Sequence, residues 1–315
     1  MKFLTLPRTE LRVSNLCFGT ADLGASVDET QSFALLDQFF ASGGNFLDTA
    51  AIYAAWTPAG KGSSEKLIAK WKKSRQLDPI IATKGAHPEL DSMQTGRVSQ
   101  AEIERDIEDS LRNLGVETLD LWYLHRDDES VEIEEVLDAL EAMTRTGKIR
   151  HYACSNWKLE RIEAFQNATK ARGAAGFVAS QPLWSLALAD FSEIDPTMRQ
   201  MTDAMRDFHA RTRLAAIPYS SQANGFFNKI AEKRALPAAY ETQSVRPINC
   251  ARFGKIENLV RHSAFSMTQI VLGYLLSQPF PTVPIIGCKT ATQLEDSLSA
   301  SDVQLSLAQL ASLEK

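Results

Sequence analysis

Apolar and polar positions along the chain predict short buried strands that alternate with amphipathic helices. An opening segment that alternates around a turn at 7–10 predicts a β-hairpin, and residues 16–20 then form a first apolar strand. Ser26 and Glu29 have the spacing of a capping box, so a helix is predicted from this point, with an apolar stripe that begins at Phe33. The same change from strand to helix recurs almost to the end of the chain.

Eight apolar runs are predicted as strands. Their last residues are Thr20, Asp48, Lys84, His125, Asn156, Gln181, Tyr219 and Gly287. Near-continuous apolar strands that alternate with helices are typical of a parallel sheet covered on both faces. A closed (β/α)8 barrel, the TIM barrel, accounts for eight such units, whereas a doubly wound open sheet usually has fewer strands and often a glycine-rich first turn. We therefore predict the barrel.

Further helix signals complete this α/β architecture. Ser99 and Glu102 have capping-box spacing at the start of another helix. The long interval before the last strand predicts an added helix around 248–260, and residues 301–313 predict a surface helix. Because no linker divides the chain, we expect residues 1–315 to form a single barrel domain with an N-terminal β-hairpin and extra helices near the C-terminus.

Composition excludes several classes of protein. The chain has 315 residues and a net charge of −5, without the basic stripe of a nucleic-acid binder. We recognise neither a signal peptide nor an apolar stretch of the ~18 residues that a membrane span needs. The cysteines lack metal-ligand spacing, so we expect no metal site, reduced thiols, a cytoplasmic location and a monomer. These cysteines are Cys17, Cys154, Cys250 and Cys288.

Four polar side chains near the predicted strand ends suggest a reaction site. Asp48, Lys84 and His125 end three consecutive strands, and Tyr53 follows Asp48 in the next loop. Active sites of TIM barrels lie at the C-terminal ends of the strands, so these groups are expected to share one pocket. The alternative is that they are separate capping, core and surface residues, which would require four coincidences on neighbouring strands.

The residue types indicate proton delivery to an oxygen. A phenol has a pKa of about 10 and is a poor proton donor at neutral pH. We expect Lys84 to lower the pKa of Tyr53, and Asp48 to keep Lys84 charged. His125 would orient a carbonyl oxygen toward Tyr53. A side chain cannot supply the hydride that such a reduction needs, so a nicotinamide cofactor is implied.

A set of motifs carries a family resemblance. They are Asp48-Thr49-Ala50 with Tyr53, Thr83-Lys84, Leu124-His125, Ser155-Asn156, Gln181 and Tyr219-Ser220. The set resembles the aldo-keto reductase superfamily over nearly the whole chain. The resemblance implies an NADP(H)-dependent reductase of aldehydes or ketones with a tetrad of Asp48, Tyr53, Lys84 and His125, in which Tyr53 donates the proton.

The resemblance also implies how the cofactor binds. The carboxamide of the nicotinamide would contact Ser155, Asn156 and Gln181, and Tyr219 would stack on its ring. The segment 287–290 leads into a helix N-terminus, which attracts anions such as a 2′-phosphate. Gln293 departs from an arginine common in the family. The expected cofactor contacts are Gly19, Thr20, Asp48, Ser155, Asn156, Gln181, Tyr219, Ser220, Ser221, Gln222, Gly225, Gly287, Lys289, Thr290 and Gln293.

The expected substrate is a small carbonyl compound in an aromatic-walled pocket. Tryptophans at three positions closely follow predicted strand ends, and Arg126 directly follows His125. We expect Arg126 to pair with the neighbouring Asp127 and Asp128 more readily than with a substrate anion. The predicted substrate-pocket residues are Leu23, Trp56, Arg126, Trp157 and Trp184.

Two other functions are compatible with the same scaffold. One is a regulatory subunit that binds the cofactor but has little turnover, as the resemblance includes accessory subunits of ion channels. The other is a lyase that uses Lys84 as a Schiff-base nucleophile. Such a nucleophile must be a neutral amine, and the neighbouring Asp48 favours the charged form.

Overall fold

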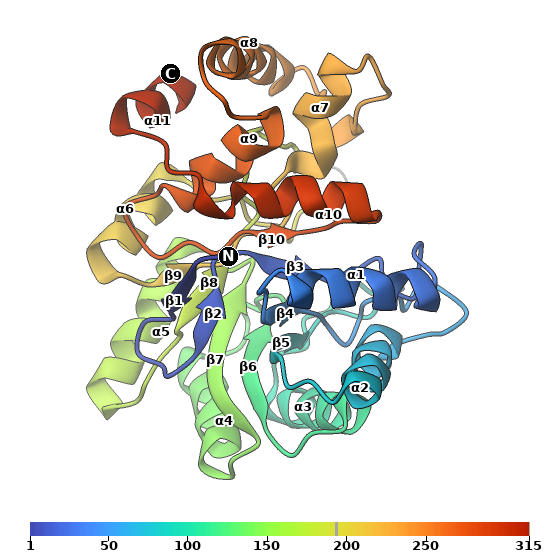
Figure 1. Cartoon of the computed structure of the whole chain (residues 1–315). Coiled ribbons are helices and arrows are strands. Elements are labelled where there is room, and N and C mark those ends of the chain that lie inside the picture. Colours follow the sequence, from blue (N-terminus) through green and yellow to red (C-terminus); the bar gives the residue numbers. More distant parts are fainter. Residues whose placement is uncertain (193–194, 315) are drawn as a thin grey trace.

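The eight apolar runs form one parallel sheet in the computed structural model, which describes residues 1–192 and 195–314 (Figure 1). The order of strands is β10-β3-β4-β5-β6-β7-β8-β9, so neighbours in sequence are neighbours in space. The strands are β3 (Cys17–Gly19), β4 (Phe46–Asp48), β5 (Ile80–Gly85), β6 (Leu119–Leu124), β7 (Ile149–Ser155), β8 (Ala179–Gln181), β9 (Ala215–Ala216) and β10 (Ile285–Ile286).

Backbone hydrogen bonds close this sheet into a barrel. The amide of Ala216 in β9 donates to Pro281, and the amide of Val283, just before β10, donates to Ala216, both at 2.9 Å. A two-stranded antiparallel hairpin of β1 (Phe3–Thr5) and β2 (Arg12–Ser14) precedes the barrel, as predicted. Side chains of this hairpin belong to the same hydrophobic cluster as the inward-facing strand residues, so the hairpin covers the barrel interior.

Helices surround the barrel and gather beyond it. After β3 to β8 come α1 (Glu29–Ala41), α2 (Ser63–Arg75), α3 (Gln100–Leu114), α4 (Ile133–Arg145), α5 (Leu159–Arg172) and α6 (Asp203–Thr212). The remaining helices are η1 (Ala223–Gly225), α7 (Phe226–Ala231), η2 (Ala238–Tyr240), α8 (Arg246–His262), α9 (Met267–Leu276), α10 (Ala291–Leu298), η3 (Ser299–Asp302) and α11 (Leu307–Glu314). Helices α7, α8, α9 and α11 stack at the top of Figure 1. The added helix expected around 248–260 is confirmed as α8, whereas the helix expected over 301–313 begins only at Leu307, as α11.

Neither predicted capping box forms. Asp28 caps α1, because its carboxylate accepts a hydrogen bond from the amide of Gln31 at 2.9 Å, and the hydroxyl of Ser26 instead donates to Asp22. Ser99 does occupy the cap position of α3, but its hydroxyl donates to the Glu102 carboxylate at 2.8 Å. In both cases the hydroxyl donates to a carboxylate, and no helix amide of the described residues donates to it.

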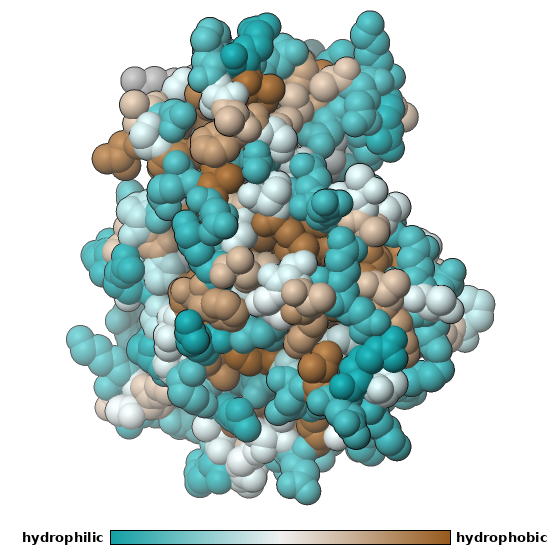
Figure 2. Space-filling model, in the orientation of Figure 1, coloured by the Kyte–Doolittle hydropathy of each residue, from teal (hydrophilic) through white to brown (hydrophobic). Residues whose placement is uncertain are grey.

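The surface in Figure 2 is mostly hydrophilic, and hydrophobic side chains are visible mainly in the furrows between elements. Within residues 1–192 and 195–314, no helix is both long and apolar enough to cross a membrane.

Candidate active site

A buried lysine links the first three predicted site residues. The Lys84 ammonium, on β5, donates to Asp48 Oδ2 at 2.6 Å, to the carbonyl of Thr49 at 2.8 Å and to the hydroxyl of Tyr53 at 3.0 Å. The side chains of Lys84 and Asp48 are 0% and 2% exposed. An ammonium has three donors, and all three are used here. Asp48 ends β4 and Tyr53 lies in the following loop, so neighbouring strands bring the groups together as predicted.

The charge of Lys84 survives burial. Burial alone would lower the pKa of this lysine, but the charges and hydrogen bonds of Asp48 and Tyr53 outweigh it, and the pKa is raised. Burying an ammonium is costly without a paired, hydrogen-bonded counter-ion. Asp48 is that counter-ion, and its other carboxylate oxygen accepts from Gln181 at 2.8 Å.

Lys84 acts on Tyr53 in the expected direction, because its charge and hydrogen bond lower the pKa of the phenol, but it does not set the net shift. Burial raises the pKa of Tyr53, and this effect exceeds the opposing effect of the Lys84 charge. The sequence shows that a cation is near the phenol but not how completely the phenol is removed from water. Tyr53 therefore keeps its proton at neutral pH.

His125 lies directly after β6 and faces Tyr53. Their ring centroids are 6.0 Å apart in an edge-on arrangement, and the ring of His87 lies 4.7 Å from that of His125. Burial, then the positive charges of His87, Arg126 and Lys84, lower the pKa of His125 well below its usual range. Its imidazole is therefore neutral at pH 7 and carries one donor and one acceptor nitrogen. The Nδ1 atom is buried and has no partner in the described part of the chain.

The residues predicted to hold a carboxamide form a connected network beside the tetrad. Ser155 donates to the carbonyl of Gln181 at 2.9 Å, and the Asn156 amide donates to the Ser155 hydroxyl at 3.0 Å. Asn156 also accepts a 2.8 Å hydrogen bond from the hydroxyl of Tyr219. Asn156 has a positive φ of 61°, a left-handed conformation that asparagine tolerates better than most residues. The binding roles of this network remain predictions.

A cleft of about 910 Å³ extends from the tetrad to α10. Asp48 and Tyr53 line it together with Lys289 and Gln293, which lie before and in the first turn of α10. Among the predicted cofactor contacts, the cleft is lined by Gly19, Asp48, Tyr219, Ser220, Ser221, Gln222, Gly225, Gly287, Lys289 and Gln293. Its volume falls in the range of binding sites for cofactors and other small molecules, about 300–1,000 Å³. Thr20 is buried next to it, with its hydroxyl donating to the carbonyl of Asp48.

The outer end of the cleft is bridged by polar contacts. Lys289 pairs with Asp22 at 2.7 Å, and its backbone amide donates to the side chain of Gln293 at 2.8 Å. Thr290 caps α10, because its hydroxyl accepts from the amide of Gln293. From the loop after β9, Gln222 donates to the hydroxyl of Ser297 at 3.0 Å. This end of the cleft therefore combines a cation with a helix N-terminus, both of which favour anions.

Three predicted substrate-pocket residues lie elsewhere. Leu23 is 1% exposed within the main hydrophobic core. Trp157 is also 1% exposed and packs edge-on against Phe177 at 5.2 Å. Trp184 lines a second cavity, separate from the cleft that holds Tyr53. A tryptophan after a strand end is thus as well suited to covering the barrel as to lining its mouth.

Trp56 and Arg126 do lie on loops after β4 and β6. Trp56 is 59% exposed, so its ring is accessible to a ligand. Arg126 pairs with Asp195 at 2.9 Å rather than with its neighbours in sequence, and Asp127 pairs with Arg161 at 3.1 Å. The expected Arg126 pairing is wrong because its partner comes from a distant segment.

Several residues of the site were not identified from the sequence, among them Asp22 and His87. Asp22 lines the cleft and neutralises Lys289, and His87 packs on His125. Asp22 and His87 lie within three residues of a predicted strand end, at Thr20 or Lys84, so a search of all polar residues in these loops would have found them. Among the residues that the structure describes, no group of three histidine, cysteine or acidic side chains is arranged to hold a metal ion.

The barrel fold and the tetrad at its strand ends together indicate one protein family. The sequence profile of the aldo/keto reductase family matches residues 15–315, and the chain belongs to that family.

Its curated relatives are oxidoreductases. YrpG, an uncharacterised oxidoreductase of Bacillus subtilis, is 28% identical over 97% of this chain and 92% of its own. Norsolorinic acid reductase stcV of Emericella nidulans is 28% identical over 95% of this chain and 77% of its own. An NADP(+) aryl-alcohol dehydrogenase of Phanerodontia chrysosporium is 27% identical over 96% of this chain and 82% of its own. A solved structure of the thermostable aldo-keto reductase Tm1743 shares the fold, with a TM-score of 0.74, 21% identity and coverage of 100% of this chain and 99% of that one.

Proposed function

We propose that the protein reduces aldehydes or ketones to alcohols with NADPH. The observation that carries this proposal is the ammonium of Lys84, which bonds to Asp48 and to the hydroxyl of Tyr53 where a long cleft begins. A protonated phenol that lines a cleft is suited to deliver a proton to a bound carbonyl.

The side chains present fit a nicotinamide. The Gln181 amide and the Ser155 hydroxyl offer donors and acceptors beside Asp48, and Tyr219 offers a flat ring. When bound, the cofactor supplies the hydride. Asn156 already uses both ends of its amide, so it exchanges partners when it holds a carboxamide.

In the proposed reduction each tetrad residue has a distinct role. Tyr53 transfers its proton to the carbonyl oxygen, and the Lys84 charge stabilises the phenolate that remains. Neutral His125 donates a hydrogen bond to the same oxygen, and Asp48 keeps Lys84 charged and in place. Solvent then reprotonates Tyr53.

NADPH is the proposed cofactor because the outer cleft favours an additional anion. Lys289 and the N-terminus of α10 lie there, and a relative is named as an NADP(+) enzyme. Aromatic aldehydes are the proposed substrates, since Trp56 is exposed on the loop that carries Tyr53 and relatives are named for aryl alcohols. The tetrad residues come from one chain, which supports a monomer as the functional unit.

The competing functions make different predictions. A Schiff-base lyase needs a neutral Lys84, but the pKa of this lysine is raised. A regulatory subunit would bind NADPH with little turnover.

Steady-state assays distinguish these functions. A panel of aldehydes is mixed with NADPH or NADH, and the absorbance of the reduced nicotinamide is followed. We expect turnover with NADPH and a kcat/KM for nitrobenzaldehyde about 10-fold or more above that for glucose, since a buried ring is worth over a kilocalorie. Binding of NADPH without turnover of any aldehyde would favour the regulatory subunit, and trapping by borohydride with substrate would favour the lyase.

A further inference from the structure

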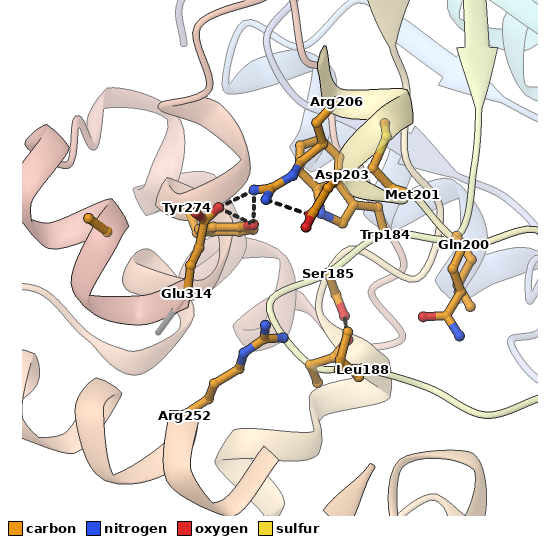
Figure 3. A pocket seen from close by; sticks show the side chains of 13 residues that line it. Trp184, Ser185, Leu188, Gln200, Met201, Asp203, Arg206, Arg252, Tyr274 and Glu314 are labelled. Atoms are coloured by element: carbon orange, nitrogen blue, oxygen red, sulfur yellow. Dashed lines mark hydrogen bonds and ion pairs between the residues drawn. The ribbon is translucent and has the colours of Figure 1, made fainter. Parts of the chain in front are cut away.

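A second cavity, of about 360 Å³, lies between the segment after β8 and the helices α6, α8, α9 and α11 (Figure 3). It shares no lining residue with the cleft that holds Tyr53. Its charged residues are Asp203, Arg206, Arg252 and Glu314. Its apolar residues include Leu183, Trp184, Leu188 and Met201.

The two arginines of this cavity differ in their partners. Arg206 donates to Asp203 at 2.8 Å and also pairs with Glu314, so it holds both carboxylates. Arg252 makes a single hydrogen bond within the described chain, from Nη1 to the carbonyl of Leu186 at 2.7 Å. No carboxylate of the described residues pairs with Arg252. Figure 3 shows its guanidinium apart from the Arg206 and Glu314 pair, toward the segment that contains Ser185 and Leu188.

The guanidinium of Arg252 lines the cavity without a carboxylate partner among the described residues. Its Nε atom is buried and has no partner among the described residues. Burial lowers the pKa of Arg252, yet an arginine remains charged at neutral pH. A buried donor of a charged group without an acceptor is costly. The Nη2 atom makes no hydrogen bond within the described chain and is not among its buried atoms, so it can donate to a carboxylate in the cavity.

The remaining walls restrict the chemistry of the ligand. Trp184 is 6% exposed and is held by Phe280, in a stacked arrangement at 5.9 Å, and by Tyr274 at 6.0 Å. A rigid aromatic wall favours a flat apolar body. The carboxylates of Asp203 and Glu314 lie in the same cavity and disfavour a second negative charge, which argues against phosphate.

We propose that this cavity binds a small aromatic monocarboxylate, with the carboxylate on Arg252 and the ring along Trp184. The volume suits a single substituted ring. This site does not depend on the proposed function, because no tetrad residue takes part in it. Its carboxylate ligands are one oxidation step above the aldehydes that we propose for the tetrad.

The test uses 4-bromobenzoate and the full chain. Titration calorimetry gives its affinity for the parent, for Arg252→Met and for Arg261→Met, a control with the same change of charge on the same helix. We expect Arg252→Met to weaken binding about 10-fold or more, and Arg261→Met to leave it unchanged. The neutral 4-bromobenzyl alcohol is expected to bind the parent about 10-fold or more weakly than the acid. Anomalous scattering from bromine then locates the ligand in crystals.

A second variant removes the dependence on Arg252→Met being well folded. Ala311→Phe narrows the cavity without changing a charge, and we expect it to weaken the binding of 4-bromobenzoate as well. Equal affinities in the parent, Arg252→Met and Ala311→Phe would overturn the proposal. So would bromine located beside Tyr53 and His125, or affinity lost in Tyr53→Phe but kept in Arg252→Met.

Discussion

Two lysine–aspartate pairs contribute residues to the same cleft and differ in burial, not in length. Lys84 and Asp48 are 2.6 Å apart with side chains 0% and 2% exposed. Lys289 and Asp22 are 2.7 Å apart with side chains 51% and 42% exposed. Contact distance alone would assign the two pairs the same importance.

The two pairs differ in their access to solvent, and this difference suits them to different roles. The buried pair cannot exchange its partners for water, so each charge depends on the other and on fixed hydrogen bonds. The exposed pair gains little from its attraction and competes with water and salt, so an incoming anion can replace Asp22 on Lys289. The buried pair is suited to fixing a reactive group, and the exposed pair to releasing and capturing a ligand.

Substitution of each lysine by methionine tests this difference most strongly. Lys84→Met leaves the Asp48 charge buried, and we expect it to lower the free energy of unfolding by about 3–5 kcal/mol. Lys289→Met, the matched control, is expected to change it by less than about 1 kcal/mol. Chemical denaturation measures both. Similar losses for the two variants would contradict the assigned roles.

Removal of the proton donor is expected to have the next largest effect. Tyr53→Phe keeps the ring and removes the hydroxyl that Lys84 holds. We expect kcat for aldehyde reduction to fall by a factor of about 10² or more, with the Kd for NADPH little changed. Stopped-flow binding and steady-state assays separate the two quantities. A Phe variant with nearly the parental kcat would exclude Tyr53 as the donor.

At the exposed end, the expected effect is on cofactor choice. Lys289→Met should raise the Kd for NADPH about 10-fold and change the Kd for NADH little, because a charge-assisted contact to the 2′-phosphate is lost. Asp22→Asn is the complementary variant: it frees Lys289 and should leave NADPH binding as tight as in the parent or tighter. If the parent protein bound NADPH and NADH with equal Kd, Lys289 would not have the proposed role in selecting NADPH.

The smallest expected effect is that of pH. Reduction needs a protonated Tyr53, and the pKa of Tyr53 is raised. The fall of kcat at high pH is therefore expected above the ordinary phenol pKa of about 10. Reduction also needs neutral His125, whose pKa is lowered, so protonation occurs only below about 6.5. With saturating NADPH, kcat should vary by less than about twofold between pH 7 and 9. A loss of activity in this interval would show that one of the two groups titrates there.

The parts predicted correctly from the sequence are those fixed by local pattern. Alternating strands and helices predict the barrel, and strand ends deliver Asp48, Lys84 and His125 to one place because adjacent parallel strands end side by side. Partners from distant segments were not predictable in this way. Arg126 forms an ion pair with Asp195, and Lys289 forms one with Asp22, although the partners of each pair are separated by many residues in the sequence.

Burial was the other quantity that the sequence did not reveal. The pKa of Tyr53 is set first by desolvation, and Trp157 belongs to the core although its position after β7 resembles a rim position. Sequence position near a strand end gives neither the extent of desolvation at Tyr53 nor the burial of Trp157.

The most direct test of the central claim follows the transferred hydrogen. NADPH with both hydrogens at C4 replaced by deuterium is mixed with nitrobenzaldehyde, and the product is analysed by mass spectrometry and NMR. We expect nitrobenzyl alcohol with one deuterium on the carbinol carbon, formed by the parent and about 10² or more times slower by Tyr53→Phe. Failure to form deuterated alcohol, or its formation at equal rates by both proteins, would contradict carbonyl reduction with Tyr53 as the proton donor.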